Sequence, residues 1–229
     1  MTVGPDGASG SEMLAILLSE RSRRRFETGS RLFHEGEPPI EAFFIFDGLV
    51  KLAKTAEDGT ESLLEFRGPG EFVGERSVVD GLPRMATGVA ATPTSVTPIP
   101  RDQLMTCIRR DADLALTMLR TLAGRVRDAF EHVLDLRAGN ATSLVATRLM
   151  QLVRDPTFDS IRTESDGTIE IDMPMTQAEL ASWAGTSHRS AANVLQQLRD
   201  DSIISTSRFQ LEIRDPTELS KRCVSTTPP

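Results

Sequence analysis

Polar side chains able to contact nucleic-acid bases are concentrated between positions 187 and 193. Arg189 can donate two hydrogen bonds to the acceptor pair of guanine, and Asn193 can pair in the same bidentate way with adenine. Ser190 lies between them. Ser187 suits a phosphate oxygen, together with the free N–H groups of a helix start. His188 fits either a base contact or a phosphate contact at an exposed position. The segment therefore has the chemistry to bind nucleic acid.

The spacing around these residues predicts a helix-turn-helix from Thr176 to Leu198. Ala181 supplies the small residue needed where two helices cross, and Gly185, four residues later, tolerates the positive φ of a tight turn. Thr186 or Ser187 can cap the second helix. The expected mutual packing faces are Leu180, Ala184, Ala191, Val194 and Leu198. An ordinary helical hairpin is the alternative. In a true motif the second helix enters the DNA major groove, and its outward N-terminal residues meet base edges.

The residues around this motif complete a winged domain over residues 139–229. A helix is expected to begin at Asn140, because the Asn-Ala-Thr-Ser segment offers capping side chains after a glycine. Downstream, apolar runs at 203–206 and 209–213 flank Ser207 and Arg208, which predicts a β-hairpin with a basic tip. Arg208 is expected at the DNA backbone, with a solvated turn residue as the alternative.

A second set of residues has the chemistry of an anion pocket. The run from Gly70 to Glu75 is followed by Asp80–Thr87, which contains Arg84. A Gly-Glu turn, a short helix and an arginine together make a pocket for a phosphodiester. Backbone amides and the guanidinium would meet the anion, and Glu75 could accept a hydrogen bond from a ribose hydroxyl.

Short strands are expected to carry this pocket in residues 1–110. Apolar or alternating runs occur at 31–34, 42–46, 49–53, 62–66, 86–91 and 95–99. Asp-Gly pairs at 47–48, 58–59 and 80–81 lie between apolar runs, which is a strong hairpin signal. Many short strands at this spacing predict a small antiparallel barrel or sandwich.

A long helix is expected over residues 111–138. Its apolar residues follow a heptad rhythm: Leu119, Leu122, Val126, Ala129, Val133 and Leu136. The flanking positions stay charged, as a solvated seam between two helices requires, so we expect this helix to pair with its copy in a homodimer. A buried core helix is the alternative, since the rhythm spans about two and a half heptads.

Composition excludes several classes of protein. Of 229 residues, 39% are hydrophobic and 26% charged, which is ordinary for a globular chain. No apolar run approaches the roughly 18 residues of a membrane helix, and Met1–Ser11 has no signal-peptide pattern, so we expect a cytoplasmic protein. No nucleophile–base set, metal-ligand cluster or phosphate loop of an enzyme is visible. The formal net charge of −7 argues against DNA binding by the chain as a whole.

The order of these elements, together with the motif at 70–87 and the helix-turn-helix, resembles the CRP/FNR family of bacterial transcription regulators. The resemblance covers about residues 14–219. It implies an α+β fold: a jelly-roll-like, cyclic-nucleotide-binding-like antiparallel barrel, a long dimerisation helix and a winged helix-turn-helix. It also implies an effector-responsive homodimer that binds near-palindromic operators in double-stranded DNA and contacts RNA polymerase. A cyclic-nucleotide-binding module that controls a protein partner is the alternative, but such a module needs no recognition helix.

The effector residues implied by the resemblance are only partly present. Gly74, Glu75 and Arg84 match the family's ribose and phosphate positions. Met85, Ala129 and Phe130 stand where cyclic-AMP-binding members carry hydroxyl groups, and a site built on hydrogen bonds loses discrimination without them. The sequence therefore argues against cyclic AMP. Arg84 could instead pair with an acidic residue of the barrel.

Other effectors of the family find less support. The iron–sulfur branch requires an N-terminal cysteine cluster, and residues 1–30 contain no cysteine. Haem would need His34 or His132 as an iron ligand, although a lone histidine is more often a surface residue. Cys107 fits either a redox switch or, more commonly, a buried inert thiol.

Overall fold

The computed structural model describes residues 18–19, 22–55, 61–154, 161–163, 167–172, 175–207 and 210–224. The chain divides into two compact units. Unit 1 comprises Met1–Lys54 and Glu65–Asp128, and unit 2 comprises Thr55–Leu64 and Ala129–Pro229. One long helix, α4, contributes residues to both.

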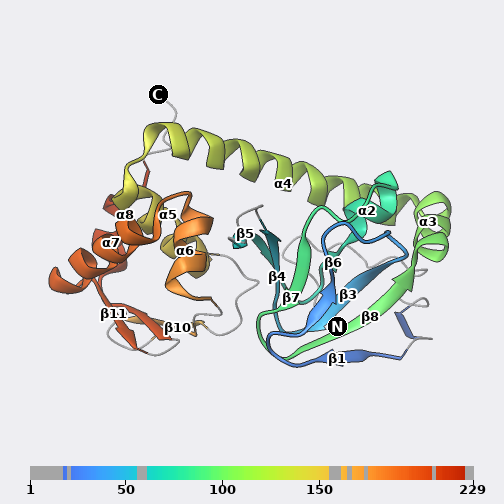
Figure 1. Cartoon of the computed structure of the whole chain (residues 1–229), viewed down its shortest axis with the longest axis horizontal. Helices are drawn as coiled ribbons and strands as arrows, with labels where there is room; N and C mark the ends of the chain where they lie inside the picture. Colours follow the sequence, from blue (N-terminus) through green and yellow to red (C-terminus); the bar gives the residue numbers. More distant parts are fainter. Residues whose placement is uncertain are drawn as a thin grey trace. The chain divides into compact units, whose positions relative to one another are not determined.

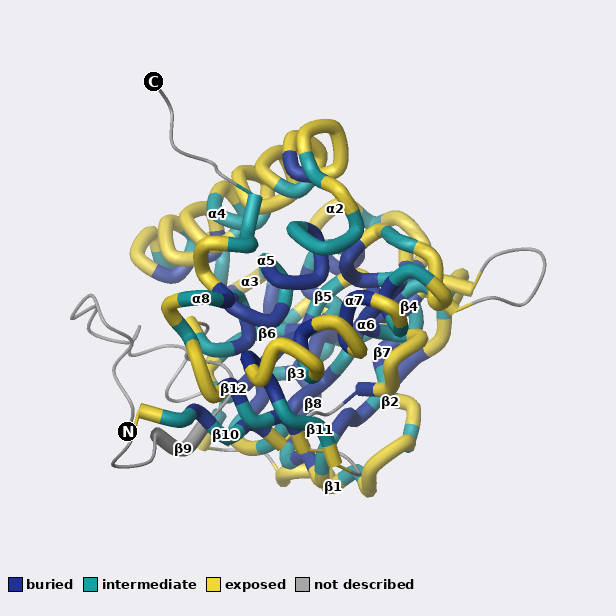
Figure 2. The backbone as a smooth tube through the Cα atoms, turned by 90° about the vertical axis from the view of Figure 1, so that its left-hand side faces the viewer, coloured by how far each residue is buried: buried dark blue, intermediate teal, exposed yellow. Residues whose placement is uncertain are grey.

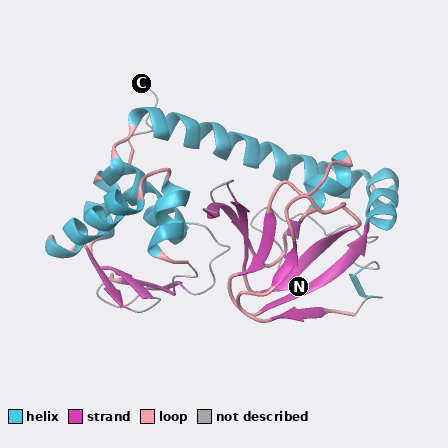
Figure 3. Cartoon of the chain, in the orientation of Figure 1, coloured by secondary structure: helices cyan, strands magenta, loops and turns pink. Residues whose placement is uncertain are grey.

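Unit 1 is built on two four-stranded antiparallel sheets (Figures 1 and 3). The strand orders are β1-β8-β3-β6 and β2-β7-β4-β5. The strands are β1 (Arg24–Phe26), β2 (Arg31–Phe33), β3 (Glu41–Asp47), β4 (Val50–Thr55), β5 (Glu61–Arg67), β6 (Phe72–Val73), β7 (Thr87–Ala90) and β8 (Thr94–Pro100). All six runs expected to be strands are confirmed, and β1 and β6 are additional. The predicted fold class is confirmed in its jelly-roll form: the strands make two sheets and not one closed barrel.

The core of unit 1 lies between these sheets. Phe33 stacks on Phe43 with ring centroids 6.1 Å apart, and both are buried with Ile45, Leu52 and Val96. These apolar side chains come from alternate positions on the strands, as expected where one face of each sheet is removed from water. The core holds β2 and the end of β6 together, and these segments flank the pocket residues.

The three Asp-Gly pairs do not all form hairpins. The pair at 58–59 joins β4 to β5, which are neighbours in one sheet, although these two residues lie outside the described part of the chain. Gly48 leads from β3 into β4 of the other sheet, with φ 80° and an N–H bonded to Asp47. Gly81 ends helix α2 with φ 77°. A positive φ serves a helix end as well as a hairpin, so the sequence signal overcounted hairpins.

Within the described residues, unit 1 also contains the helices α2 (Glu75–Asp80), α3 (Arg101–Arg110) and the first part of α4 (Ala112–Ala138). Leu104 of α3 is fully buried with Val78 and Ile99. Cys107 is buried in an apolar cluster with Leu114 and Met118, which is the environment of an inert structural thiol.

Unit 2 contains helices and one four-stranded sheet of order β11-β12-β10-β9. Its elements are α5 (Ala141–Arg154), β9 (Ile161–Thr163), β10 (Ile169–Asp172), α6 (Gln177–Ala184), α7 (His188–Asp200), β11 (Ile204–Ser207), β12 (Gln210–Ile213) and α8 (Pro216–Lys221). The Ser143 N–H bonds the Asn140 side chain, which confirms the predicted start of α5. β11 and β12 pair antiparallel from Ile204–Ile213 to Ser207–Gln210, which confirms the hairpin.

Candidate DNA-binding helix and effector cassette

Helices α6 and α7 form the predicted helix-turn-helix. Thr176 caps α6 and exchanges hydrogen bonds with Glu179, a reciprocal capping box that the Thr-x-x-Glu pattern could have revealed. Gly185 ends α6 with φ 71°. The small side chain of Ala181 is 1% exposed. The five expected packing residues, Leu180, Ala184, Ala191, Val194 and Leu198, are all buried.

The side chains expected to meet DNA lie at the start of α7. Ser187 caps this helix by accepting a hydrogen bond from the Ser190 N–H at 3.1 Å. His188, Arg189 and Asn193 are exposed, and Ser190 is half-buried. Packing therefore holds the helix by its opposite face and leaves this row of polar groups at the surface.

The exposed row of α7 extends beyond the predicted residues to Gln197. Gln197 follows Asn193 by four residues and is exposed on the same face of α7. The i, i+4, i+8 spacing from Arg189 through Asn193 to Gln197 was the signal available for finding it. Arg199, near the end of the helix, is turned to internal contacts instead, because it donates to Thr206 of β11 and to Gln196. Arg208, predicted for the hairpin tip, lies outside the described residues.

In the cassette, which is the predicted anion pocket at residues 70–87, the arginine is buried. Arg84 is 4% exposed, and its two terminal nitrogens donate to the backbone carbonyl of Gly74, at 2.6 Å, and to that of Glu41. Its guanidinium carbon lies 4.5 Å from the centroid of the Phe33 ring. Burial lowers the pKa of Arg84, against the raising effect of Glu41, Glu37 and Glu75. The side chain joins three segments of unit 1, and only its Nε lacks a hydrogen-bond partner.

The cassette glutamate is paired as well. Glu75 is 5% exposed and forms an ion pair with Arg125 of α4, whose guanidinium also lies 3.6 Å from Glu71. Arg125 could not be predicted as this partner from the sequence, because it lies 50 residues from Glu75 and no local pattern connects the two. The pair neutralises a carboxylate that would otherwise be buried alone.

Little space remains beside these groups. The cavity next to Gly74, Glu75 and Arg84 measures about 20 Å³, while ligand sites typically reach about 300–1,000 Å³. Met85 is 46% exposed at its edge and offers a thioether where a hydroxyl would serve a phosphate. Ala129 and Phe130 lie on α4 in unit 2, and both are exposed.

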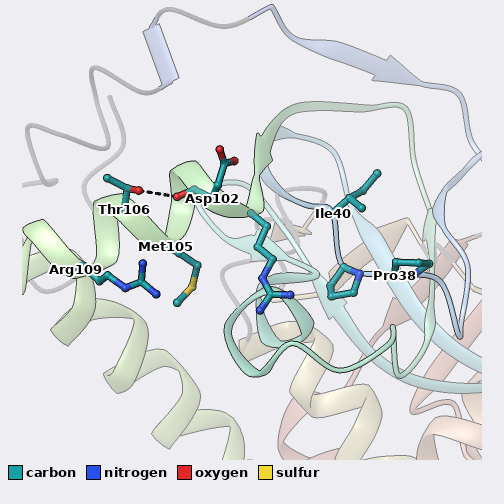
Figure 4. A pocket seen from close by; sticks show the side chains of 8 residues that line it. Pro38, Ile40, Asp102, Met105, Thr106 and Arg109 are labelled. Atoms are coloured by element: carbon teal, nitrogen blue, oxygen red, sulfur yellow. Dashed lines mark hydrogen bonds between the residues drawn. The ribbon is translucent and has the colours of Figure 1, made fainter.

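A larger hollow of unit 1 is an open groove between residues 38–40 and α3, about 600 Å³ in volume (Figure 4). Ile40 and Met105 form apolar parts of its wall, and the Thr106 hydroxyl is turned back to the Asp102 carbonyl at 2.7 Å. Its walls contain no cassette residue, so its size adds nothing to the effector site.

Helix α4 is largely exposed (Figure 2), and several of its exposed residues are large and apolar. Leu119, Val126 and Val133 of the predicted seam are 62%, 55% and 46% exposed, and Phe130 is 67% exposed beside them. Leu122 lies closer to the rest of unit 1 and is half-buried. Leu136 packs toward Gly185, where a Cβ atom would come within 2.3 Å of its Cδ2.

The described residues contain no helix long and apolar enough to cross a membrane. In the same part of the chain, no group of three His, Cys, Asp or Glu side chains could hold a metal ion. His34 is exposed, and His132 is half-buried beside Arg148.

Two family models match most of the chain. Residues 23–111 match the cyclic nucleotide-binding domain, and residues 145–222 match the Crp-like helix-turn-helix domain. The "CRP-like cAMP-activated global transcriptional regulator" of Mycobacterium tuberculosis is 28% identical over 209 residues, which cover 91% of each chain. The "Cyclic AMP receptor protein" of Thermus thermophilus is 28% identical over 213 residues, or 92% of each chain.

The structure of FixK2 from Bradyrhizobium japonicum superimposes with a TM-score of 0.76 at 22% identity, covering 90% of this chain and 99% of that one. Together with the exposed polar row on α7, these matches define a DNA-binding transcription regulator with a cyclic-nucleotide-binding-like effector domain. The chain belongs to the CRP/FNR family of transcription regulators.

Proposed function

We propose that this regulator acts as a homodimer that reads near-palindromic operators through α7, under the control of a small effector, and that it contacts RNA polymerase when bound to DNA. One observation carries the proposal: the exposed face at the start of α7 offers Arg189 and Asn193, and the stretch from Gly185 to Arg199 contains no acidic residue. A module that controls only a protein partner would not need this face.

Base reading by α7 follows from the types of side chain in the row. A guanidinium and a carboxamide on one helical face can each make a bidentate contact in the major groove. Ser187 and the first N–H groups of α7 suit a phosphate that fixes the depth of the helix. His188 is exposed beside them and adds either a base contact or a phosphate contact.

Replacement of the central arginine tests this role. With a duplex selected from a random library by the unmodified protein, Arg189→Ala should weaken binding by about 1–3 kcal/mol, measured by fluorescence anisotropy. Binding to random DNA should change less. The matched control is Arg214→Ala, since this arginine is exposed in unit 2 and pairs with Glu212 at 3.2 Å. An equal loss on selected and random DNA would refute base reading.

Dimerisation is proposed through the exposed apolar face of α4. Apolar side chains scattered singly on a surface are common, but a row on one helix face marks an interaction site. Val126→Asp, which places a charge in the middle of this row, should convert dimers to monomers in light scattering. Arg127→Asp, at the next and exposed position, serves as the control. A dimer that persists in the Val126 variant contradicts this interface.

Cyclic AMP is proposed not to be the effector, although the two relatives named above are described as responding to it or receiving it. The terminal nitrogens of Arg84 are committed to carbonyl groups, and the adjoining cavity is about 20 Å³. Met85, Ala129 and Phe130 provide no hydroxyl for a phosphate or a base. Calorimetric titration should show no saturable binding of cyclic AMP at micromolar concentrations. Tight binding there would overturn this part of the proposal.

A further inference from the structure

One arginine connects helix α7 to strand β11 of the hairpin. Arg199, in the last turn of α7, is half-buried, and its Nη1 donates to the Thr206 hydroxyl of β11 at 3.0 Å. Its Nη2 donates to the side-chain oxygen of Gln196 at 2.8 Å. Within the described residues, no other side-chain hydrogen bond joins α7 to β11. Arg199 therefore links the helix proposed to read bases with the hairpin beside it.

The direction of the Arg199 side chain is set by its neighbours on the helix. Gln196 accepts from Arg199 with its oxygen, and its Nε2 donates to the Asp200 carboxylate at 2.7 Å. The spacing of these residues, i, i+3 and i+4, puts them on one face of α7. A cation, an amide and a carboxylate bonded in series polarise one another and strengthen both bonds. The guanidinium is therefore held on the side of α7 that faces β11.

The bond to Thr206 reaches the hairpin beyond its base. The base is already fixed, since the Ile203 N–H bonds the Leu198 carbonyl at 2.9 Å and the Arg214 N–H bonds the Ile203 carbonyl at 2.8 Å. Thr206 lies three residues further along the chain, roughly 10 Å from this base at the rise of a strand. A second attachment at that distance sets the direction of the outer half of β11, which ends at the exposed Ser207.

The groups proposed to read bases lie at the other end of α7. Arg189 and Arg199 are ten residues apart, which corresponds to about 15 Å along a helix. Helix and hairpin can contact one duplex together only when the angle between them suits the DNA. An angle that is fixed before binding spares the free energy of ordering the hairpin on the DNA.

We propose that Arg199 is a positioning residue, which fixes the outer half of β11 relative to α7 so that hairpin and helix contact the same DNA duplex. The inference rests on the proposed base reading by α7 and on the expected contact of the hairpin with the DNA backbone. It assigns Arg199 no direct contact with DNA, although a basic residue on this helix would suit a phosphate.

A double-mutant cycle in the full-length protein tests this role. Thr206→Val removes the acceptor and keeps a β-branched side chain, and Arg199→Met removes the donors. Affinity for a duplex selected by the unmodified protein is measured by fluorescence anisotropy over a range of salt concentrations. Each phosphate contact contributes about 0.9 to the slope of log K against log salt concentration. Both single variants and the double variant should lower the slope equally, by about 0.9, because all three release the same hairpin contact.

Two further variants calibrate the measurement. Ser205→Ala is the matched control, since Ser205 precedes Thr206 on β11 and belongs to the opposite face of the strand. It should leave the slope unchanged. Arg208→Ala, at the predicted hairpin tip, should lower the slope by about 0.9, and adding Thr206→Val to it should change nothing further. The slope counts contacts made by folded protein, so a loss of stability alone does not lower it.

The outcomes separate this inference from the proposed function. A lower slope in Arg199→Met with an unchanged slope in Thr206→Val would mean that Arg199 contacts a phosphate directly, which overturns the proposal. Additive losses in the double variant also overturn it. Unchanged slopes in all of these variants would show that the hairpin makes no backbone contact, and the inference would fail while base reading by α7 stands. Failure of the unmodified protein to select any duplex would refute the proposed function itself.

Discussion

Arg84 and Arg189 are the same type of residue in two regions that use it in opposite ways. Arg84 is 4% exposed, bonds two backbone carbonyls and stacks on Phe33. Arg189 is exposed at the start of α7, on a helix held by its other face. The cassette arginine thus holds unit 1 together, whereas the helix arginine is available to a partner. A motif match identifies a position, and burial and bonding decide whether the position is free to bind.

The largest expected effect concerns Arg84. Arg84→Met removes the donors to two buried carbonyl groups, each of which costs about 1–3 kcal/mol when left without a partner. We expect the free energy of unfolding to fall by about 2–4 kcal/mol in urea titrations. Arg189→Ala should change it by less than about 0.5 kcal/mol, because the side chain is exposed. Equal stability of the two variants would remove the distinction between these regions.

An intermediate effect is expected at the turn of the helix-turn-helix. Gly185→Ala puts a side chain on a residue with φ 71°, and the new Cβ would lie 2.3 Å from Cδ2 of Leu136. Left-handed backbone costs about 1–2 kcal/mol for a residue with a Cβ, so unfolding should become easier by that amount or slightly more.

Gly124→Ala is the control for this change. Gly124 lies inside α4, and an added Cβ would meet nothing within 4 Å, so alanine should stabilise the helix by up to about 1 kcal/mol. We expect Gly185→Ala to lower the thermal unfolding temperature and Gly124→Ala to raise it. A rise in unfolding temperature for both variants would show that Gly185 is not held in its turn conformation.

The smallest effect is a pH dependence in unit 2. Burial, with the nearby charge of Arg148, lowers the pKa of His132 to about 4 from 6.5. The unfolded chain therefore binds the proton first, and His132 reduces stability as the pH falls from about 6.5 to about 4. Burial raises the pKa of Asp135. Asp135 therefore reduces the stability of the fold as the pH rises, which is the opposite of the effect of His132.

His132→Gln isolates this contribution. Urea unfolding at about pH 7 and about pH 4.5 should show a smaller loss of stability for the variant than for the unmodified protein. The half-buried position of His132 allows solvent to reduce the effect, which is why we place it last. A variant with the same or a larger loss would assign the acid sensitivity to other groups.

The two regions also differ in how far the sequence predicts them. The caps, the Gly185 turn and the buried face of the helix-turn-helix depend on residues close together in the chain, and the structure confirms them. The partners of the cassette could not be found in this way, since Arg84 bonds the carbonyl of Glu41 and Glu75 pairs with Arg125. Such contacts depend on how strands and α4 pack, which no local spacing encodes.

The net charge of the whole chain also differs in sign from the charge of the α7 segment. The chain has a net charge of −7, and residues 140–229 contain nine Lys or Arg against twelve Asp or Glu. The exposed row of α7 is nevertheless free of acidic residues from Gly185 to Arg199. This distribution predicts weak nonspecific attraction to DNA. Specific contacts should therefore supply a larger share of the binding free energy.

Selection of duplexes from a random library by the unmodified protein tests the central claim most directly. A homodimer that reads DNA with α7 should enrich sequences with two inverted half-sites whose centres lie about 10 base pairs, or a multiple of that, apart. Enrichment of a single half-site without an inverted copy, or no enrichment above the starting library, would contradict the account.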